Sequence, residues 1–502
     1  HCCLTSESRL ARSPRFAPGG KKLIWLANDA GFDTHSGCYQ LKIADWDANG
    51  GGGIVGASKT LVGVVEIPEG PNGFPGLWMD DLPRSCWQPD GKAVYLTTSW
   101  GSADAVTRVN AETGAVTRVT AAAAIAGSNG GGGGAASASV LIVSKEGVLV
   151  ETSAPNVLQR VGIVPFEACC EGAGVDSCLS GPRLGRLLPT TTPVAAAAVA
   201  AAEEAVAGLR WRVLTVTPKD TGNPPSGKLA AAAAALPFEA ILVEPPLPSK
   251  GASYSSGASS ARLPPLLVVP HGGPHGAVPT RFLPLFEFLA ATQGFCVLHV
   301  NFRGSTGFGN AVLDSLPGRV GMADVGDVVE ATKATLALQP PVADASRVGI
   351  YGGSHGGFLG AHLTGQYPNL FRAAALLNPV INIPAMAATT DIPDWCAVEA
   401  LGAGQYDWTK AELPTADQLA RMHAASPLAH AANVRAPTLL LIGAKDRRVP
   451  PSQGITWHHM LKARGLESEL HLYPEDSHPI DNPASSADSW LNMARWMKKH
   501  LA

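Results

Sequence analysis

The stretch Arg347–Gly356 reads RVGIYGGSHG and decides the fold. Its first half is a short apolar segment that predicts a buried strand, and its second half, Gly352–Gly356, fits the pattern G-x-S-x-G. This pattern forms a sharp strand-to-helix turn that exposes the serine Oγ, and the residues two before and two after the serine must be small to avoid the neighbouring strand and helix. The N-terminus of the following helix favours developing negative charge. Ser354 is therefore the predicted nucleophile; a plain glycine-rich turn is the alternative in a chain with 55 glycines.

The 265 residues from Phe238 to Ala502 alternate between strand and helix patterns. Several of the expected strands are almost entirely apolar, which is typical of parallel strands covered on both faces. Helices are expected at Asp324–Leu338 and Trp490–Leu501, so this region is predicted to be a doubly wound α/β domain. The expected strands are Ala240–Val243, Leu266–Val269, Phe295–Val300, Arg347–Tyr351, Ala373–Leu377, Thr438–Ile442 and Glu469–Leu472.

A serine nucleophile needs a base, and proteins with this turn carry the order Ser…Asp…His along the chain. The acid follows a buried strand, and Asp446 ends the stretch TLLLIGAKD, residues 438–446. The histidine follows the next strand, and His478 comes shortly after the strand expected to end at Leu472. We predict a triad of Ser354, the nucleophile, His478, the general base and then acid, and Asp446, which orients the imidazole and stabilises its protonated form.

Other acids and histidines of this region fit these roles less well. Two acids lie in a proline-containing stretch without a preceding strand, and a third is too close to His478 to approach it from a separate strand end. One histidine alternates within a strand, and an adjacent pair lies in an expected helix, where structural histidines are the commoner finding. These competitors are, in that order, Asp391, Asp394, Asp476, His471, His458 and His459, and the helix is Gly454–Arg464.

A tetrahedral intermediate needs hydrogen-bond donors for its oxyanion. The segment Pro270–His275, PHGGPH, follows the expected strand Leu266–Val269, the place where hydrolases carry such a loop. Glycine there lets a backbone N–H approach the substrate oxygen. We predict the N–H groups of Gly273 and His355 as the donors, each worth roughly 3 kcal/mol. A simple tight turn is the alternative for this loop.

The chain before about residue 218 has a different pattern. Its apolar segments are short, rich in aromatic and β-branched residues, and separated by turn residues, which favours an all-β architecture. The sequences FAPGGK at residues 16–21 and WQPDGK at residues 87–92 each precede such a segment, and their prolines are 71 residues apart. This echo favours β-propeller blades. The spacing exceeds the roughly 40–50 residues of one blade, so an insertion or an unrecognised copy must lie between the two turns. Two such turns also occur by chance in other β proteins. Examples of the strands are Lys22–Asn28, Ala93–Trp100, Val140–Ser144 and Leu209–Thr217.

Low-complexity runs interrupt the chain and are expected to be flexible inserts or linkers. The predicted organisation is a partial β-propeller over residues 1–218, an Ala/Gly/Pro-rich linker over 219–237 and the α/β domain over 238–502. The runs are Gly130–Gly134, Val194–Ala202, Ala230–Ala235 and the loop Pro245–Pro265.

Composition excludes several classes of protein. The formal net charge is −3, so no basic surface for nucleic acid is expected, and 46% of the residues are hydrophobic, which does not fit a disordered chain. The apolar run near residues 194–202 is too short for a membrane span, which needs about 20 residues. The nine cysteines have neither zinc spacing nor a regular disulfide pattern, so reduced thiols and a cytoplasmic location are expected. No metal or cofactor is expected.

Six separated motifs in this order closely resemble the acylaminoacyl peptidases of the prolyl oligopeptidase family of serine peptidases. The resemblance is dense over Leu266–Ala502 and thinner back to about Ser13. The motifs are HGGPH (271–275), NFRGSTGF (301–308), GGSHGGF (352–358), NPVINI (378–383), DIPDWC (391–396) and DRRVP (446–450).

The resemblance implies an α/β-hydrolase domain capped by a β-propeller. It also implies the release of an N-acyl amino acid from the end of a short blocked peptide, and it allows a homo-oligomer. The triad and oxyanion loop coincide with those above, and Arg448 falls where relatives place an arginine that holds a substrate carbonyl; a solvated loop arginine is the alternative. Phe302 replaces the tyrosine common in the family. About 218 residues are enough for four blades rather than seven, so the first part of the propeller is expected to be missing.

Other functions remain open at this point. A general esterase or another propeller-capped peptidase would use the same triad, and an incomplete propeller would leave the chain inactive. The acyl-group preference, the preferred residue before the cleaved bond and the oligomeric state do not follow from the sequence.

Overall fold

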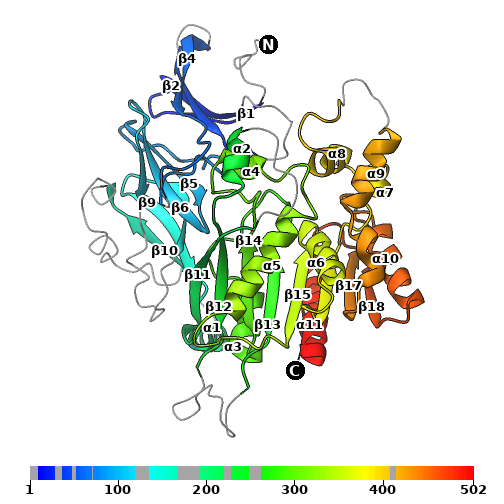
Figure 1. The fold of residues 1–502 in the computed structure, drawn as a ribbon. Helices are drawn as coiled ribbons and strands as arrows, with labels where there is room; N and C mark the ends of the chain where they lie inside the picture. The colour runs from blue at the N-terminus through cyan, green and yellow to red at the C-terminus, as the bar shows by residue number, and fades with distance from the viewer. Residues whose placement is uncertain are drawn as a thin grey trace.

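The computed structural model describes residues 10–28, 37–47, 52–70, 72–119, 135–166, 193–219, 228–247, 262–407 and 414–501. Its centre is an eight-stranded sheet in the order β11-β12-β14-β13-β15-β16-β17-β18 (Figure 1). The pairs β11/β12 and β12/β14 are antiparallel, and the strands from β14 to β18 pair in parallel. The strands are β11 (Arg210–Val216), β12 (Phe238–Glu244), β13 (Leu266–Pro270), β14 (Cys296–Asn301), β15 (Val348–Gly353), β16 (Ala373–Leu377), β17 (Thr438–Gly443) and β18 (Ser468–Tyr473).

Helices cover both faces of this sheet and enclose two hydrophobic cores. One core joins the strands to α5, α6 and α10, and the other joins them to α1, α3 and α11. The inner parallel strands are buried along nearly their whole length, which explains their apolar sequences, whereas the edge strand β18 is partly exposed. The helices of this region are α1 (Pro193–Ala207), α2 (Lys228–Ala233), α3 (Pro284–Gln293), α4 (Asn310–Asp314), α5 (Ala323–Leu336), α6 (His355–Gln366), α7 (Ile383–Ala387), α8 (Pro393–Leu401), α9 (Ala416–Ala424), η5 (Pro427–Asn433), α10 (Ser452–Ala463) and α11 (Pro483–Leu501).

The N-terminal part forms three antiparallel sheets, in the orders β1-β2-β3-β4, β5-β6-β7 and β10-β9-β8. One core joins the first sheet to the second and another joins the second to the third, so the sheets pack face to face in chain order, as propeller blades do. The strands are β1 (Leu10–Phe16), β2 (Lys22–Asn28), β3 (Gln40–Trp46), β4 (Ile54–Val62), β5 (Ala93–Trp100), β6 (Ala103–Asn110), β7 (Val116–Val119), β8 (Ser137–Val143), β9 (Val148–Ala154) and β10 (Val157–Val164). The chain is thus an α/β-hydrolase domain with a propeller-like cap, as the sequence predicts.

The two echoed turns adopt the same structure. Each begins with a backbone hydrogen bond from the residue before the proline to the residue five positions later, Ala17 to Lys22 (2.9 Å) and Gln88 to Ala93 (2.8 Å). Each contains a glycine with positive φ at the same place, Gly20 at 68° and Gly91 at 72°. The 71-residue spacing therefore covers the first sheet and its connection to the second, and the described residues between the turns contain no further sheet.

Two expectations about the region between the cap and the α/β domain are wrong. Residues 209–217 were expected in the propeller, but β11 pairs with β12 along seven positions and is the edge strand of the central sheet. Its half-buried pattern is that of a covered edge strand, which the sequence does not distinguish from a blade strand. The two alanine runs form helices rather than linkers: Val194–Ala202 lies in α1, and Ala230–Ala235 begins in α2. In α2, Ala230 and Ala233 are buried, and Ala233 contacts α4. The run Gly130–Gly134 lies outside the described residues.

The tip of the β5–β6 hairpin docks on the loops at the carboxyl edge of the central sheet. Gly101 N–H donates to the Gly307 carbonyl (2.8 Å), and the Ser102 carbonyl accepts from Thr280 N–H (2.7 Å). The Asn301 side chain donates to the Ser102 hydroxyl (2.9 Å). These contacts fix the cap above the edge where the predicted site residues lie. Among the helices of the described ranges, none has the length and apolar character needed to cross a bilayer.

Candidate active site

Ser354 lies at a strained turn between β15 and α6, with φ 57° and ψ −121°. Its N–H donates to the Leu377 carbonyl of the neighbouring strand (2.9 Å). A Cβ on Gly352 would overlap the backbone of Gly356, and a Cβ on Gly356 would overlap the Pro270 carbonyl oxygen. Both flanking positions therefore need glycine, and the turn has the geometry that G-x-S-x-G predicts. Such strain persists only where the surroundings enforce it, and it is common at functional sites.

Asp446 and His478 meet at the carboxyl edge, just after β17 and β18. His478 Nδ1 lies 2.7 Å from Asp446 Oδ2. The Asp446 carboxyl group is fully buried, and its other oxygen accepts from the backbone N–H groups of Arg448 (2.8 Å) and Val449 (2.9 Å). A carboxylate only accepts hydrogen bonds, so His478 carries its proton on Nδ1 and leaves Nε2 as an acceptor. The imidazole remains 27% exposed, open to a substrate.

Asn378 connects the loops that carry the three predicted triad residues. It follows Leu377, whose carbonyl binds Ser354 N–H, and it has a positive φ of 41°. Its Nδ2 donates to the His478 carbonyl (2.8 Å), and its Oδ1 accepts from Gly443 N–H (2.9 Å), at the end of β17. Within the described residues no hydrogen bond joins the Ser354 hydroxyl to His478; such bonds often form only when substrate binds. Sequence reasoning missed Asn378, although an asparagine just after a buried strand was visible in NPVINI.

The loop after β13 lies directly against Ser354. A Cβ on Gly272 would be 3.5 Å from the Ser354 Cβ. Burial lowers the pKa of His271 to about 4, so the ring is neutral, with Nδ1 donating to the Gly272 carbonyl (2.7 Å) and Nε2 in contact with the Ser305 hydroxyl oxygen (2.7 Å). Because this carbonyl is held toward His271, the N–H of Gly273 in the same peptide unit points the opposite way. The Phe302 ring stacks on His271 (4.3 Å between centroids), so the phenylalanine found in place of tyrosine serves as packing.

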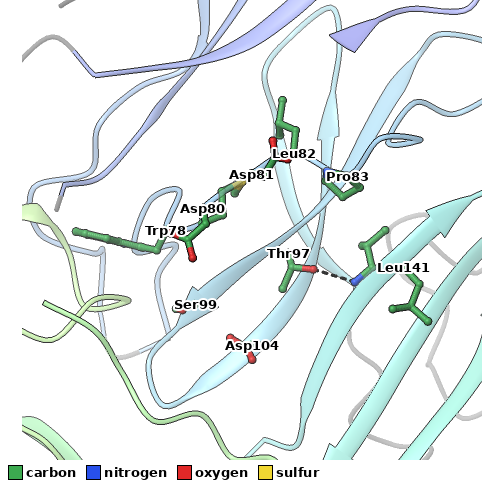
Figure 2. Close-up of a pocket in the computed structure, with 11 residues that line it drawn as sticks. Trp78, Asp80, Asp81, Leu82, Pro83, Thr97, Ser99, Asp104 and Leu141 are labelled. Carbon is green, nitrogen blue, oxygen red and sulfur yellow. Dashed lines mark hydrogen bonds between the residues drawn. The ribbon is translucent and has the colours of Figure 1, made fainter. Parts of the chain in front are cut away.

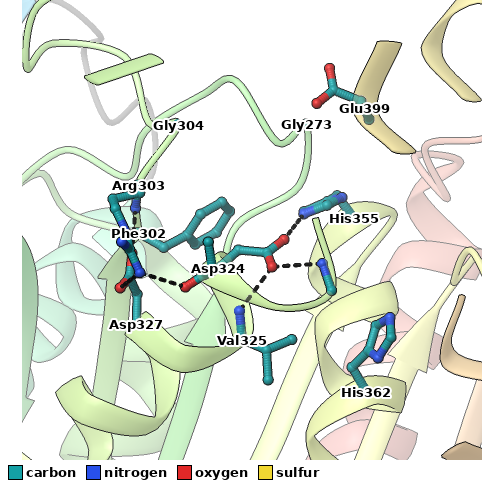
Figure 3. Close-up of polar contacts among 12 residues, drawn as sticks. Gly273, Phe302, Arg303, Gly304, Asp324, Val325, Asp327, His355, His362 and Glu399 are labelled. Atoms are coloured by element: carbon teal, nitrogen blue, oxygen red, sulfur yellow. Dashed lines mark hydrogen bonds and ion pairs between the residues drawn. The ribbon is translucent and has the colours of Figure 1, made fainter. Parts of the chain in front are cut away.

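His355 begins α6 and directly follows Ser354, the predicted nucleophile. Its side chain is completely buried, with Nε2 2.8 Å from Asp324 Oδ2 (Figure 3). The other oxygen of Asp324 accepts from Gly321 N–H (2.8 Å) and Val325 N–H (2.9 Å). One turn further along α5, Asp327 binds Arg303 through 2.8 Å contacts from Nε and a terminal nitrogen. Helix α5 thus supports both the turn at Ser354 and the loop that carries Phe302.

The competing residues lie elsewhere or have other partners. Asp391 accepts from Arg448 Nε (2.8 Å), in a pair with both side chains nearly half exposed. Asp476 accepts from Asn482 N–H (3.1 Å), and His458 contacts the Ser468 hydroxyl (2.8 Å). The Arg448 guanidinium is therefore beside the site but paired, while its N–H serves Asp446.

Two concavities of the described structure lie outside these residues. The first, about 440 Å³, lies in the cap, and its lining includes Asp80, Asp81 and Asp104 (Figure 2). The second, about 500 Å³, lies where the cap meets the central sheet and is mostly apolar. It contains the cation–aromatic pair Arg118 and Trp100, and Glu239 lies close enough to offset the arginine charge. Neither concavity is lined by Ser354, Asp446 or His478.

Known proteins resemble this chain along its whole length. Residues 285–502 match the prolyl oligopeptidase family, and residues 1–165 match the N-terminal domain of acylamino-acid-releasing enzyme. Acylamino-acid-releasing enzyme 1 of Oryza sativa subsp. japonica is 35% identical over 99% of this chain and 59% of its own length. The Homo sapiens acylamino-acid-releasing enzyme is 33% identical over 100% of this chain and 60% of its own length. The chain thus spans about three fifths of these relatives.

Solved structures share the fold. Pyrococcus horikoshii acylaminoacyl peptidase superposes with a TM-score of 0.67 at 18% identity, covering 96% of this chain and 62% of that one. A Mycobacterium tuberculosis puromycin-hydrolyzing peptidase gives 0.66 at 19% identity, covering 99% and 71%. Together with the serine turn, these matches lead to one assignment: residues 285–502 belong to the prolyl oligopeptidase family, and residues 1–165 match the N-terminal domain of acylamino-acid-releasing enzyme.

Proposed function

We propose that this protein releases an N-acyl amino acid from the N-terminus of short blocked peptides, with Ser354, His478 and Asp446 as its catalytic triad. The observation that supports this most is the 2.7 Å contact between His478 Nδ1 and the buried Asp446 carboxylate, beside a serine held at φ 57°. The substrate class comes from the relatives at 33–35% identity, which are named acylamino-acid-releasing enzymes.

The reaction follows from the roles of these groups. The Ser354 Oγ attacks the carbonyl carbon of the first peptide bond while His478 Nε2 takes the hydroxyl proton. The intermediate collapses, the C–N bond breaks, and His478 gives the proton to the leaving amine. Water then attacks the acyl-enzyme while His478 takes a proton from it. The bond between the carbonyl carbon and Ser354 Oγ breaks, His478 returns the proton to Oγ, and the N-acyl amino acid leaves. Asp446 keeps the imidazole oriented and stabilises its protonated form in each step.

The oxyanion of each intermediate is stabilised by the N–H groups of Gly273 and His355. The Gly273 N–H points away from the carbonyl that His271 holds, and the His355 N–H is at the start of α6, where N–H groups have no partner in the helix. Each donor contributes roughly 3 kcal/mol to transition-state stabilisation. Arg448 is proposed to bind a substrate carbonyl, for which its exposed pair with Asp391 would open.

The cap above the site would admit short peptides and exclude folded proteins. The four cysteines described as free, Cys38, Cys86, Cys296 and Cys396, are all buried, which suits a reducing compartment, so we place the protein in the cytoplasm. Homo-oligomer formation is part of the same proposal because family members often form oligomers.

The experiment compares acetyl-Ala-p-nitroanilide with Ala-p-nitroanilide, using Ser354→Ala as the blank. The expected result is a higher kcat/KM for the acetylated substrate and no turnover by the variant. Faster cleavage of the unblocked substrate would contradict the proposal and point to another propeller-capped peptidase. Turnover restricted to p-nitrophenyl esters would point to a general esterase, and no turnover of any substrate to an inactive chain.

A further inference from the structure

The loop Pro270–Gly276 contains three glycines, which lose more conformational freedom on ordering than any other residue. Gly273 has a φ of 121°, a value that other residues rarely adopt. A loop of this composition keeps one geometry only if neighbouring elements hold it. His271 holds one side, through the Gly272 carbonyl. The other side is held by helix α8, to which the proposed function assigns no role.

Helix α8 touches this loop at two points. Trp395 Nε1 donates to the Gly273 carbonyl (3.0 Å), and the Glu399 carboxylate lies 3.2 Å from His275 Nε2. Trp395 and Glu399 are four residues apart, so they lie on the same face of the helix. The side chains of His275 and Glu399 are 2% and 0% exposed, and Glu399 is drawn above Gly273 in Figure 3. The pair is therefore shielded from solvent and close to the peptide that carries the proposed oxyanion donor.

His275 connects its own loop both to helix α8 and to the NFRGSTGF segment. Its Nδ1 donates to the Gly304 carbonyl (2.8 Å), and Thr306 N–H donates to the Gly276 carbonyl (2.9 Å), which ties the loop to the NFRGSTGF segment. Burial opposes protonation of the ring, but Glu399, the Gly304 carbonyl and the more distant Asp314 raise the pKa of His275 above its ordinary value. A protonated ring has an N–H on both nitrogens, so Nδ1 donates to Gly304 while the positive charge on the ring faces the Glu399 carboxylate.

The other charged groups around His275 are few. Asp314, on α4, has a pKa raised to about 6 by burial and by Glu66 of the cap. The nearby His271 is neutral. Glu399 is thus the carboxylate in direct contact with His275, and its removal would leave the imidazolium buried without an adjacent counter-charge. Removing one partner of a buried ion pair is much more costly than losing an exposed one.

We propose that Glu399 is a positioning residue for the oxyanion hole: acting through His275, and together with Trp395, it holds the loop in the geometry that directs the Gly273 N–H at the reacting carbonyl. The proposal rests on the proposed function, which identifies the Gly273 N–H as an oxyanion donor. It gives helix α8, which contains the end of the DIPDWC motif, the role of supporting the oxyanion loop.

The test uses Glu399→Gln with Glu469→Gln as its matched control, a change at a half-exposed glutamate on β18. Hydrolysis of p-nitrophenyl acetate is the kinetic readout because it does not depend on the preference for acylated peptides. We expect kcat of Glu399→Gln to fall by about 10–100-fold with KM changed less than about threefold, since losing a donor outright costs about 10²–10³-fold. The alkaline limb of its pH profile moves to lower pH, because His275 loses its proton more easily, and the acid limb stays.

A second readout does not need activity. Hydrogen–deuterium exchange of the peptide covering residues 270–276 is expected to rise in Glu399→Gln and to stay unchanged in the control. If Glu399→Gln does not fold, Trp395→Phe removes the bond to the Gly273 carbonyl and keeps an aromatic ring, and the same rise is expected. Exchange equal to the control, or unchanged kcat, would overturn the proposal. Raised exchange in Glu399→Gln, combined with a wild-type protein that has no activity, would refute the proposed function and leave the positioning role supported.

Discussion

The Asn378 Nδ2 group donates a 2.8 Å hydrogen bond to the backbone carbonyl of His478, a residue 100 positions further along the chain. Through its Oδ1 the same amide holds the end of β17, from which the Asp446 loop begins. One side chain therefore sets the distance between the loop of the proposed acid and the loop of the proposed base. The carbonyl of the preceding residue, Leu377, accepts from Ser354 N–H. Residues 377 and 378 therefore hydrogen-bond to all three loops and couple their positions.

Replacing Asn378 by alanine should thus loosen the triad rather than remove a reacting group. We expect Asn378→Ala to lower kcat by about 10–100-fold, because small misplacements of catalytic groups are costly. The control is Asn369→Ala, at a surface asparagine that accepts from Arg435 (3.0 Å). Steady-state kinetics of both variants with acetyl-Ala-p-nitroanilide make the comparison. Equal kcat for the two would show that the loops are fixed without Asn378.

Asp446→Asn tests the orientation of the base. An amide at this position presents an N–H as well as an oxygen to the imidazole, so the tautomer with the proton on Nε2 becomes favourable and the serine loses its acceptor. We expect kcat to fall by about 10⁴-fold, as in other Ser-His-Asp triads, while the melting temperature changes little. A loss below about tenfold would mean that Asp446 does not serve His478.

His299 should make the protein less stable in acid. Burial lowers the pKa of this histidine to about 3, and both ring nitrogens are buried without a hydrogen-bond partner in the described structure. The unfolded chain takes up a proton near pH 6.5 and the folded chain does not, so stability is full above pH 6.5 and falls as the pH drops toward 3. For one such histidine the loss at pH 5 is about 2 kcal/mol.

His299→Leu removes this dependence. Denaturant unfolding at pH 8 and pH 5 should give a smaller loss of unfolding free energy for the variant than for the wild type. His423→Leu, at an exposed position on α9, is the control and should leave the difference unchanged. A loss in His299→Leu as large as that of the wild type would mean that His299 is protonated in the folded protein.

The sequence predicted the central sheet well because parallel strands buried on both faces have a strong apolar pattern. It also predicted where Asp446 and His478 lie, because strand ends meet at one edge in a doubly wound sheet. It missed Asn378 and Glu399, whose contacts are with His478 and His275, 100 and 124 residues away. Contacts at such separations leave no local pattern.

Two structural errors have a similar origin. The edge strand β11 and the blade strands share a half-buried pattern, and only the partner strand tells them apart. The alanine runs have too little side-chain surface to predict packing, yet Ala233 is completely buried in α2. In both cases the deciding contact is made by another part of the chain.

The most direct measurement of the triad is covalent labelling with a fluorophosphonate followed by mass spectrometry of the peptides. We predict one phosphonyl adduct, on Ser354, formed at a rate that falls by about 10³-fold or more in His478→Ala. An adduct on another residue, or a labelling rate that His478→Ala leaves unchanged, would contradict it.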